Sequence, residues 1–185
     1  MKDHIKKAAG FIIFFTILCG LIYPLVITGI GNLLFPNKSN GSIITVQDKN
    51  SGSELIGQTF TSDRYFHGRP SATNNTSMPS SGTNYGPTSA NLKTIVDSLT
   101  KEIRTFNNLK ENDYIPPDAV FSSASGVDPH ISPRYAFLQI QRIAKARNIK
   151  EETIRQLVEK NIENSVFGPQ VVNVLKLNIA LDGIK

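Results

Sequence analysis

Residues 8–35 read AAGFIIFFTILCGLIYPLVITGIGNLLF, and these 28 residues contain no charged side chain. As a helix they span about 42 Å, at about 1.5 Å per residue. The hydrocarbon core of a bilayer is about 30 Å thick, so such a helix crosses it with tilt or with its last turn outside the lipid. A helix buried in a globular domain rarely runs this far without a charge. The stretch therefore predicts a transmembrane helix.

A cleaved signal peptide is the alternative interpretation of this stretch. The apolar region of a signal peptide is about 7–15 residues long and ends in a small-x-small cleavage site. Here the apolar run is longer and no such site closes it. Thr16-Ile17-Leu18-Cys19 also departs from a lipoprotein box, because Leu18 is bulky where a small residue belongs. The sequence favours a retained anchor.

The charges that flank the span indicate its orientation. Lys2, Lys6 and Lys7 precede it, whereas Lys38 and Lys49 follow it. Basic residues are enriched on the cytoplasmic side of a membrane helix. We therefore expect a cytoplasmic tail over residues 1–7, a transmembrane helix over 8–35 and an extracytoplasmic domain over 36–185.

The span also carries a ridge of small or polar residues, mostly at four-residue steps, with bulky apolar side chains mostly elsewhere. The ridge consists of Thr16, Gly20, Pro24 and Thr28, followed by Gly31 and Asn32. In lipid, helices associate through small residues that let two backbones approach closely. The first four residues of the ridge are therefore candidates for an interface with another membrane helix.

Charge and cysteine content exclude several classes of function. The net charge of +5 includes three basic residues and one acid before the span, which leaves +3 on the rest. That excess is too small to indicate a nucleic-acid partner. The single cysteine, Cys19, lies inside the span, so the domain beyond it has no disulfide framework and no cysteine zinc site.

The pattern of apolar residues beyond the span predicts an α+β domain. We expect short strands over residues 42–47, 54–61 and 119–121, and a long polar loop over 71–89. We also expect four helices, each starting at a capping residue or a polar boundary. They are a helix after Ser89 ending near Phe106, one from Ser132 to about Asn148, one over Glu151–Asn164 and one capped by Asn173 within 171–181, although the last stretch is also compatible with a strand.

The sequence contains little that indicates chemistry. It has no phosphate-binding glycine loop, no nucleophile-elbow motif and no Asp-Lys-Thr-Gly phosphorylation site. Asp128-Pro129-His130 is the one suggestive pair, with Ser122, Ser123, Ser125 and Ser132 nearby in the sequence, but nothing completes a set of metal ligands. A membrane-anchored hydrolase that uses Asp128 and His130 is one hypothesis. A structural turn, in which Asp128 bonds its own backbone, is the simpler interpretation.

A stretch without acidic residues, 131–150, carries five basic side chains. They are Arg134, Arg142, Lys145, Arg147 and Lys150. A solvated helix face is the simpler interpretation, and attraction to anionic lipid or to an acidic partner is the alternative.

Several short stretches together resemble one family in both order and spacing. They are Leu55-Ile56-Gly57-Gln58, Tyr65-Phe66, Arg69-Pro70-Ser71-Ala72, Asn84-Tyr85-Gly86-Pro87, Ser125-Gly126-Val127-Asp128-Pro129-His130-Ile131-Ser132, Gln141-Arg142-Ile143-Ala144, Ala146-Arg147, Val172-Asn173-Val174-Leu175, Leu177-Asn178 and Leu181-Asp182. With the span before them, they resemble the C subunit of the Kdp potassium-transporting P-type ATPase of bacteria. Two positions differ from that pattern, because Ala124 and Val171 stand where glycine and arginine are common.

The resemblance implies a subunit without catalysis of its own in the bacterial cytoplasmic membrane. Its partners would be membrane lipid, a potassium-channel-like subunit and a P-type subunit that hydrolyses ATP. It would support assembly and act as a catalytic chaperone that raises ATP binding by the P-type subunit, with ATP as the ligand of the complex. The family's nucleotide-linked stretch corresponds to Ser81, Gly82, Thr83 and Asn84, with Ser81 in place of a glycine. Asp128 and His130 would then be interface candidates rather than catalytic residues.

Overall fold

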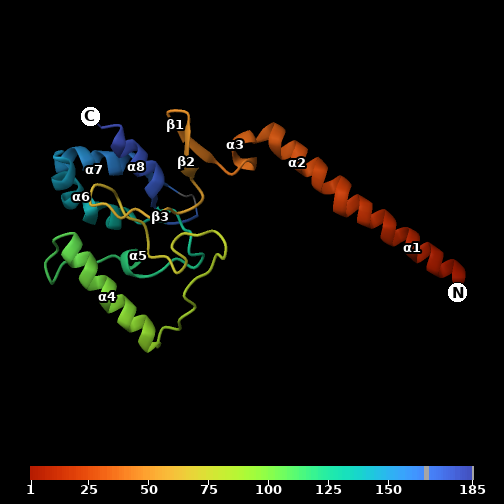
Figure 1. The fold of residues 1–185 in the computed structure, drawn as a ribbon, viewed down its shortest axis with the longest axis horizontal. Helices are drawn as coiled ribbons and strands as arrows, with labels where there is room; N and C mark the ends of the chain where they lie inside the picture. Colours follow the sequence, from red (N-terminus) through yellow and green to blue (C-terminus); the bar gives the residue numbers. More distant parts are fainter. Residues whose placement is uncertain (165–166, 185) are drawn as a thin grey trace. The chain divides into compact units, whose positions relative to one another are not determined.

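The structure is a computed structural model that describes residues 1–164 and 167–184. The chain divides into two compact units, Met1–Ser53 and Glu54–Lys185. Each unit is described by itself below, with the elements labelled as in Figure 1.

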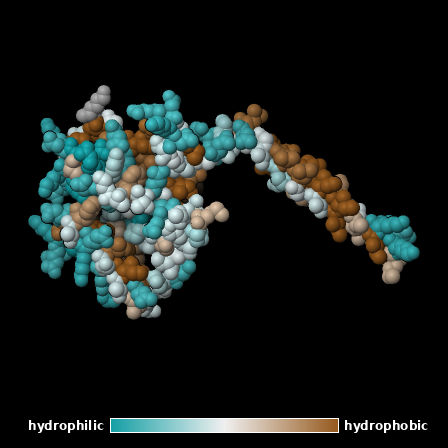
Figure 2. Space-filling model, in the orientation of Figure 1, coloured by the Kyte–Doolittle hydropathy of each residue, from teal (hydrophilic) through white to brown (hydrophobic). Residues whose placement is uncertain are grey.

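The first unit begins with a helix of 33 residues, Lys2–Leu34, which is long and apolar enough to cross a membrane. It consists of α1 (Lys2–Ile17), a π-helical turn η1 (Leu18–Ile22) and α2 (Tyr23–Leu34). Figure 2 shows apolar residues along this helix and a hydrophilic cluster at its N-terminal end. The finding fits the predicted span.

Pro24 accounts for the π-helical turn. Proline has no N–H, so the Gly20 carbonyl cannot accept the hydrogen bond that an α-helix would place there, and the proline ring would clash with that carbonyl. The helix widens by one residue instead, and the Tyr23 N–H bonds to the Leu18 carbonyl, five residues back.

Beyond the span, the first unit forms a short helix and a hairpin. Helix α3 (Pro36–Ser39) leads into β1 (Ile43–Val46) and β2 (Lys49–Ser53), which pair in antiparallel register. Gln47 and Asp48 turn the chain with positive φ at both positions, the geometry that a two-residue hairpin favours.

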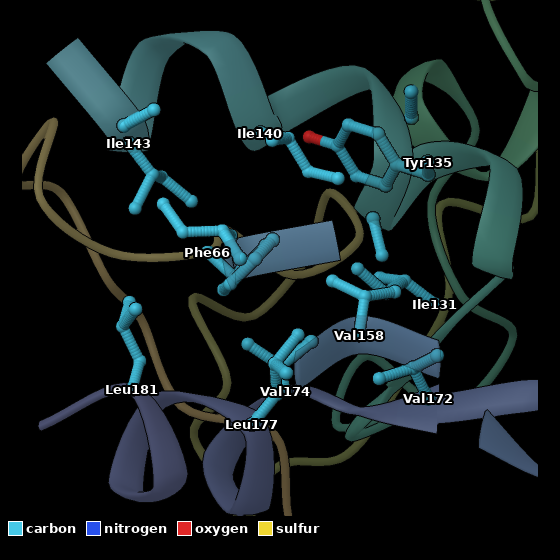
Figure 3. Close-up of a cluster of buried hydrophobic side chains, with 14 of the residues drawn as sticks. Phe66, Ile131, Tyr135, Ile140, Ile143, Val158, Val172, Val174, Leu177 and Leu181 are labelled. Carbon is cyan, nitrogen blue, oxygen red and sulfur yellow. The ribbon is translucent and has the colours of Figure 1, made fainter. Parts of the chain in front are cut away.

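The second unit is built on three helices and a small sheet. α6 (Pro133–Arg147) packs against α7 (Glu151–Lys160), which also contacts α8 (Val174–Asp182). The antiparallel strands lie in the order β3 (His130–Ile131), β5 (Val171–Asn173), β4 (Ile162–Glu163). The core consists of the buried faces of these elements. In Figure 3, Phe66 lies between Ile140 and Ile143 of α6 on one side and Leu177 and Leu181 of α8 on the other.

The remaining helices of the second unit are α4 (Ala90–Phe106) and α5 (Pro117–Val120). α4 follows the long loop 71–89, which contains no helix or strand, as the polar composition predicted. The Ser89 hydroxyl accepts from the Leu92 N–H, so the predicted cap is confirmed. Only Ile103 of the α4 apolar face is buried; the rest of that face is half-buried or exposed.

Side-chain amides hold the irregular segment 54–75 in place where a strand ladder is absent. Asn178 of α8 accepts from the Phe66 N–H at 2.8 Å and donates to the Phe66 carbonyl at 2.9 Å. Gln139 of α6 brackets His67 in the same way, at 2.8 and 3.1 Å. The two amides satisfy both backbone groups of two successive residues, which is what a neighbouring strand would otherwise do.

The predicted strand over 54–61 is wrong. The Gly57 N–H bonds to the Val127 carbonyl, but a Cβ at Gly57 would lie 2.8 Å from the Asp128 carbonyl oxygen. The segment therefore crosses a loop at close range and forms no ladder. The second strand of the hairpin is instead the polar stretch Lys49–Ser53, which apolar periodicity does not reveal.

The other corrections concern local boundaries. Residues 117–120 form a helical turn and the predicted strand over 119–121 is wrong, because Pro117 occupies the first helical position, where its missing N–H costs nothing. α7 ends at Lys160 rather than Asn164, since Ile162 pairs with Val172 in the sheet. The ambiguous stretch 171–181 contains both structures: a strand to Asn173, then the predicted helix with Asn173 as its cap. The mixed helix and sheet content agrees with an α+β domain.

Candidate functional site

Asp128-Pro129-His130 forms a turn that leads into β3. One Asp128 oxygen accepts from the His130 N–H at 3.0 Å and lies 3.3 Å from His130 Nδ1. The other accepts from Arg69 Nη1 at 3.0 Å. Burial alone would raise the pKa of Asp128, but the hydrogen bonds from His130 and Arg69 outweigh it and lower that pKa. The Pro129 carbonyl accepts from the Val174 N–H, so the turn is also fixed to the start of α8.

The serines near this turn serve the backbone. Ser123 and Ser125 accept from the Gly126 and Val127 N–H groups. Ser132 caps α6 and donates to Asp118 at 2.9 Å. Among the described residues, no serine is hydrogen-bonded to His130, and no group of three histidine, cysteine or acidic side chains could hold a metal ion. The arrangement is that of a turn stabilised by its own carboxylate.

The stretch Ser80–Asn84 lies against the loop 124–126. Ser80 donates to the Ser125 carbonyl at 2.6 Å. A Cβ at Gly82 would stand 2.8 Å from the Ala124 carbonyl oxygen, so this position needs glycine for close packing of two chain segments. Asn84 adopts positive φ. These contacts give Gly82 a structural role, and nucleotide binding by Ser81, Gly82, Thr83 and Asn84 stays a prediction.

Two of the five basic residues in 131–150 are structural, which the sequence did not reveal. Arg142 is 8% exposed and bonds to Asn107, Gln139 and the carbonyls of Asp63 and Tyr65. Its guanidinium lies over the Phe106 ring, 4.5 Å from the centroid. Burial lowers the pKa of Arg142 to about 10. A solvated face is therefore the wrong interpretation for this residue.

Arg147 closes a second cluster on the same helix. It bonds to Asp182 at 2.6 Å and to the Arg64 carbonyl at 2.7 Å, and it lies over the Tyr65 ring. Tyr65 donates to Asp182 in turn. Arg134, Lys145 and Lys150 are exposed, as a solvated face predicts. Arg142 and Arg147 are five residues apart with no acidic residue between them, and this spacing did not indicate that each binds its own cluster of partners.

The span presents the predicted ridge on a helix that has no buried residue. The residues Thr16, Gly20, Pro24 and Thr28 all lie within Lys2–Leu34, of which no part is buried inside the structure. A Cβ at Gly20 would meet open space. A row at four-residue steps slants around an α-helix, because one turn takes about 3.6 residues. The wider turn at Leu18–Ile22 reduces that drift and keeps the ridge closer to one side.

Comparison with known proteins places the whole chain in one family. The family model described as "K+-transporting ATPase, c chain" (KdpC) matches residues 5–183. A potassium-transporting ATPase KdpC subunit of Caldanaerobacter subterraneus subsp. tengcongensis is 47% identical over 184 residues, covering 98% of this chain and 95% of that protein. Those of Allorhizobium ampelinum and Clostridium perfringens are 46% and 41% identical, and each match covers 97% or more of both chains. The chain therefore belongs to the KdpC family, the c chain of the K+-transporting ATPase.

Proposed function

We propose that this subunit of the potassium-transporting ATPase is an accessory, non-catalytic one, which supports assembly of an ATP-driven potassium import complex. The match over residues 5–183 carries the proposal, because it includes both the apolar helix and the second unit. The engagement of Asp128 and the neighbouring serines in backbone hydrogen bonds supports the absence of a catalytic centre.

The partners in this proposal are a potassium-channel-like subunit and a P-type subunit that hydrolyses ATP. The ridge from Thr16 to Thr28 packs against a membrane helix of one of them. The chain has its N-terminus in the cytoplasm and its second unit outside, so it raises ATP binding by the P-type subunit through the assembled complex. In this arrangement ATP is the ligand of the complex, and the P-type subunit is the one that hydrolyses it.

Purification of the tagged full chain from membranes tests the proposal. Mild detergent should release it with two larger membrane subunits in fixed stoichiometry, and the preparation should hydrolyse ATP in response to potassium. Recovery of the chain alone, from cells that express all subunits, would argue against an assembly role and in favour of an independent activity.

His130→Ala separates the accessory role from the hydrolase that uses Asp128 and His130. The substitution removes one contact of a turn that Arg69 and the Val174 N–H also hold. We expect weaker assembly or lower stability, by about 1–2 kcal/mol. We expect ATP turnover per assembled complex to stay the same. A fully assembled complex with turnover reduced by about 10²-fold or more would indicate a catalytic histidine instead.

A further inference from the structure

The ring of His67 lies where the C-terminal end of α4 meets the irregular segment 54–75. It stacks on the Phe106 ring, with 5.0 Å between the two centroids. The Arg142 guanidinium lies over that same ring, 4.5 Å from its centroid. Phe106 thus contacts one group that carries a charge at every physiological pH and one that ordinarily gains a charge near about pH 6.5. The end of α4 therefore rests on a residue whose charge depends on pH.

The neutral form of His67 fits these surroundings. The Ser62 carbonyl lies 2.9 Å from Nε2 and can only accept a hydrogen bond, so Nε2 carries the hydrogen of the neutral ring. The Gln139 side chain holds the backbone of His67 from both sides, at 2.8 and 3.1 Å. A second proton would therefore enter at Nδ1, on a partly buried ring whose position is already fixed.

The charges that face His67 come from two helices and from its own segment. Arg142 of α6 opposes a proton on the ring, whereas Asp63 favours one. Glu102 of α4 and Arg69 of the irregular segment line the cleft that the ring also lines. Burial is the largest influence, and together with Arg142 it outweighs the favourable contacts and lowers the pKa of His67. The packed arrangement thus disfavours the protonated ring.

The α4 side of this contact can open at the lower cost. Every residue of α4 is described, and Ile103 alone is buried among them. Phe106 is 39% exposed, and beyond it Asn107 accepts from Arg142 Nε at 3.0 Å. The irregular segment, in contrast, is fixed by side-chain amides and by the other nitrogens of Arg142. Local opening is easiest where few buried contacts are lost, which here is the end of α4.

We propose that a proton on His67 releases the C-terminal end of α4 and opens the cleft of about 330 Å³ beneath it, which Leu99 and Ile103 line. Release lets water reach the charged ring, while Arg142 keeps the irregular segment in place. The second unit is then an acid-responsive device. Only one consequence rests on the proposed function: with this unit outside the cell, the external medium sets the state of α4.

Proton linkage gives the direction and the size of the effect. Once α4 is released, the ring regains its ordinary pKa of 6.5, so the open form binds a proton more readily than the closed form. Opening is therefore independent of pH well above 6.5 and increases as the pH falls below that value. One coupled proton raises the opening equilibrium constant by at most about tenfold between about pH 7.5 and 5.5.

Hydrogen exchange of the full chain in detergent at these two pH values tests the proposal. After correction for the intrinsic effect of pH on exchange, protection of the last turn of α4 should fall by up to about tenfold, and protection of α7 should not change. His67→Gln should abolish the fall, whereas His4→Gln, in the first unit, should retain it. Constant protection of α4 in wild type, an equal fall in α7, or an unchanged fall in His67→Gln would each overturn the proposal.

A distance measurement tests the same opening with His67 intact. In a Cys19→Ser background, Thr105→Cys and Lys145→Cys place spin labels at exposed positions on α4 and α6, and Lys145→Cys with Gln156→Cys provides a control pair on α6 and α7. Acidification from about pH 7.5 to 5.5 should add a population of longer distances to the first pair and leave the control pair unchanged. Identical distance distributions for the first pair at both pH values would overturn the proposal, whatever the orientation of the chain in the membrane.

Discussion

At the scale of single residues, Arg142 joins α4, α6 and the irregular segment 54–75 of the second unit. Its guanidinium donates hydrogen bonds to the side-chain carbonyls of Gln139 and of Asn107, the C-cap residue of α4. It also donates to two backbone carbonyls of the irregular segment. It stabilises that segment by using a planar group with five donors where no strand is available. Lysine has the same charge but cannot reproduce the planar fork.

Arg142→Lys should therefore destabilise the protein although it conserves charge. The carbonyls of Asp63 and Tyr65 lose their donor, and we expect a loss of about 2–4 kcal/mol in the free energy of unfolding. Denaturation of the full chain in detergent, followed by circular dichroism, measures it. Lys145→Met on the exposed face of the same helix is the matched control and should change stability by less than about 0.5 kcal/mol. Equal effects of the two substitutions would contradict the role given to Arg142.

His67 makes the stability of the second unit depend on pH. Burial lowers the pKa of His67 below its ordinary value of 6.5, while Nε2 lies 2.9 Å from the Ser62 carbonyl. The unfolded chain thus binds a proton more readily than the folded chain. The stability that neutral His67 contributes is fully present above pH 6.5 and is lost as the pH falls through the lowered pKa.

Unfolding measured from about pH 7.5 to 5.5 should therefore show a decline in wild type that is smaller in His67→Gln. His4→Gln, outside the second unit, is the control and should follow the wild-type curve. An identical slope in all three proteins would mean that His67 has the same pKa in the folded and unfolded chain.

At the scale of elements, the helices could be predicted from the sequence but the irregular segment could not. Ser89, Ser132 and Asn173 each cap the helix that follows them, because capping depends on residues a few positions apart. The path of residues 54–75 depends instead on Gly57 crossing residue 128 and on amides more than 70 residues away. No local pattern encodes such contacts.

The same distinction applies to the candidate sites. Asp128 bonding to its own backbone was the simpler of the two local interpretations, and that geometry is present. The buried role of Arg142 was missed, since an arginine in a basic stretch looks the same in the sequence whether it is solvated or enclosed. Position 142 is three residues from Gln139 and next to Ile143 of the predicted apolar face, so it borders the inner side of α6, which was the available signal.

Asn178→Ala tests whether the two hydrogen bonds between the Asn178 side chain and the Phe66 backbone hold the irregular segment in place. The substitution leaves the N–H and the carbonyl of fully buried Phe66 without partners, so we expect a loss of about 2–4 kcal/mol. Hydrogen exchange at the Phe66 amide should accelerate more than exchange in α7. Gln156→Ala, an exposed amide on α7, should leave both unchanged. Undisturbed protection of Phe66 in Asn178→Ala would show that another group holds the segment.

Gly20→Leu tests the ridge on the span. A bulky side chain there would hold a partner helix away, and lipid offers no hydrophobic compensation for the lost contact. We expect less partner subunit in the purified complex, with the second unit still folded by circular dichroism. Gly10→Leu, away from the ridge on the same helix, should co-purify normally. Normal assembly of Gly20→Leu would place the interface on another face of the helix.

At the scale of the whole molecule, the chain consists of two differently built units. The first unit is a helix of 33 residues with a hairpin, and the second has its own core of buried side chains from residue 66 onward. The basic residues before the span and the uncharged run that follows support a single crossing with the N-terminus inside.

Protease added to intact spheroplasts should therefore cut the second unit and leave a membrane-bound fragment that contains the span. The mature protein should also retain the residues before position 20, as mass spectrometry of the isolated chain would show. A soluble cytoplasmic protein that survives and an external protein that is cut provide the two controls. Survival of the second unit under these conditions would reverse the orientation, and a mature chain that begins beyond residue 20 would identify a signal peptide.

The side-chain hydrogen bonds that hold the irregular segment also set the order in which the protein can fold during synthesis. Phe66 waits for Asn178, which is 112 residues later, and Glu54 is bound through its carbonyl to Asn173, which is 119 residues later. Ribosomes add about 5–20 residues per second. Residues 54–66 are therefore synthesised several seconds before Asn173 and Asn178, which bind them in the folded protein. During that interval the span is already available to enter the membrane, while Phe66 lacks its pocket. The nascent chain is thus anchored before its second unit folds. Until Asn173 and Asn178 are synthesised, residues 54–66 can be shielded only by other molecules that bind them at the membrane.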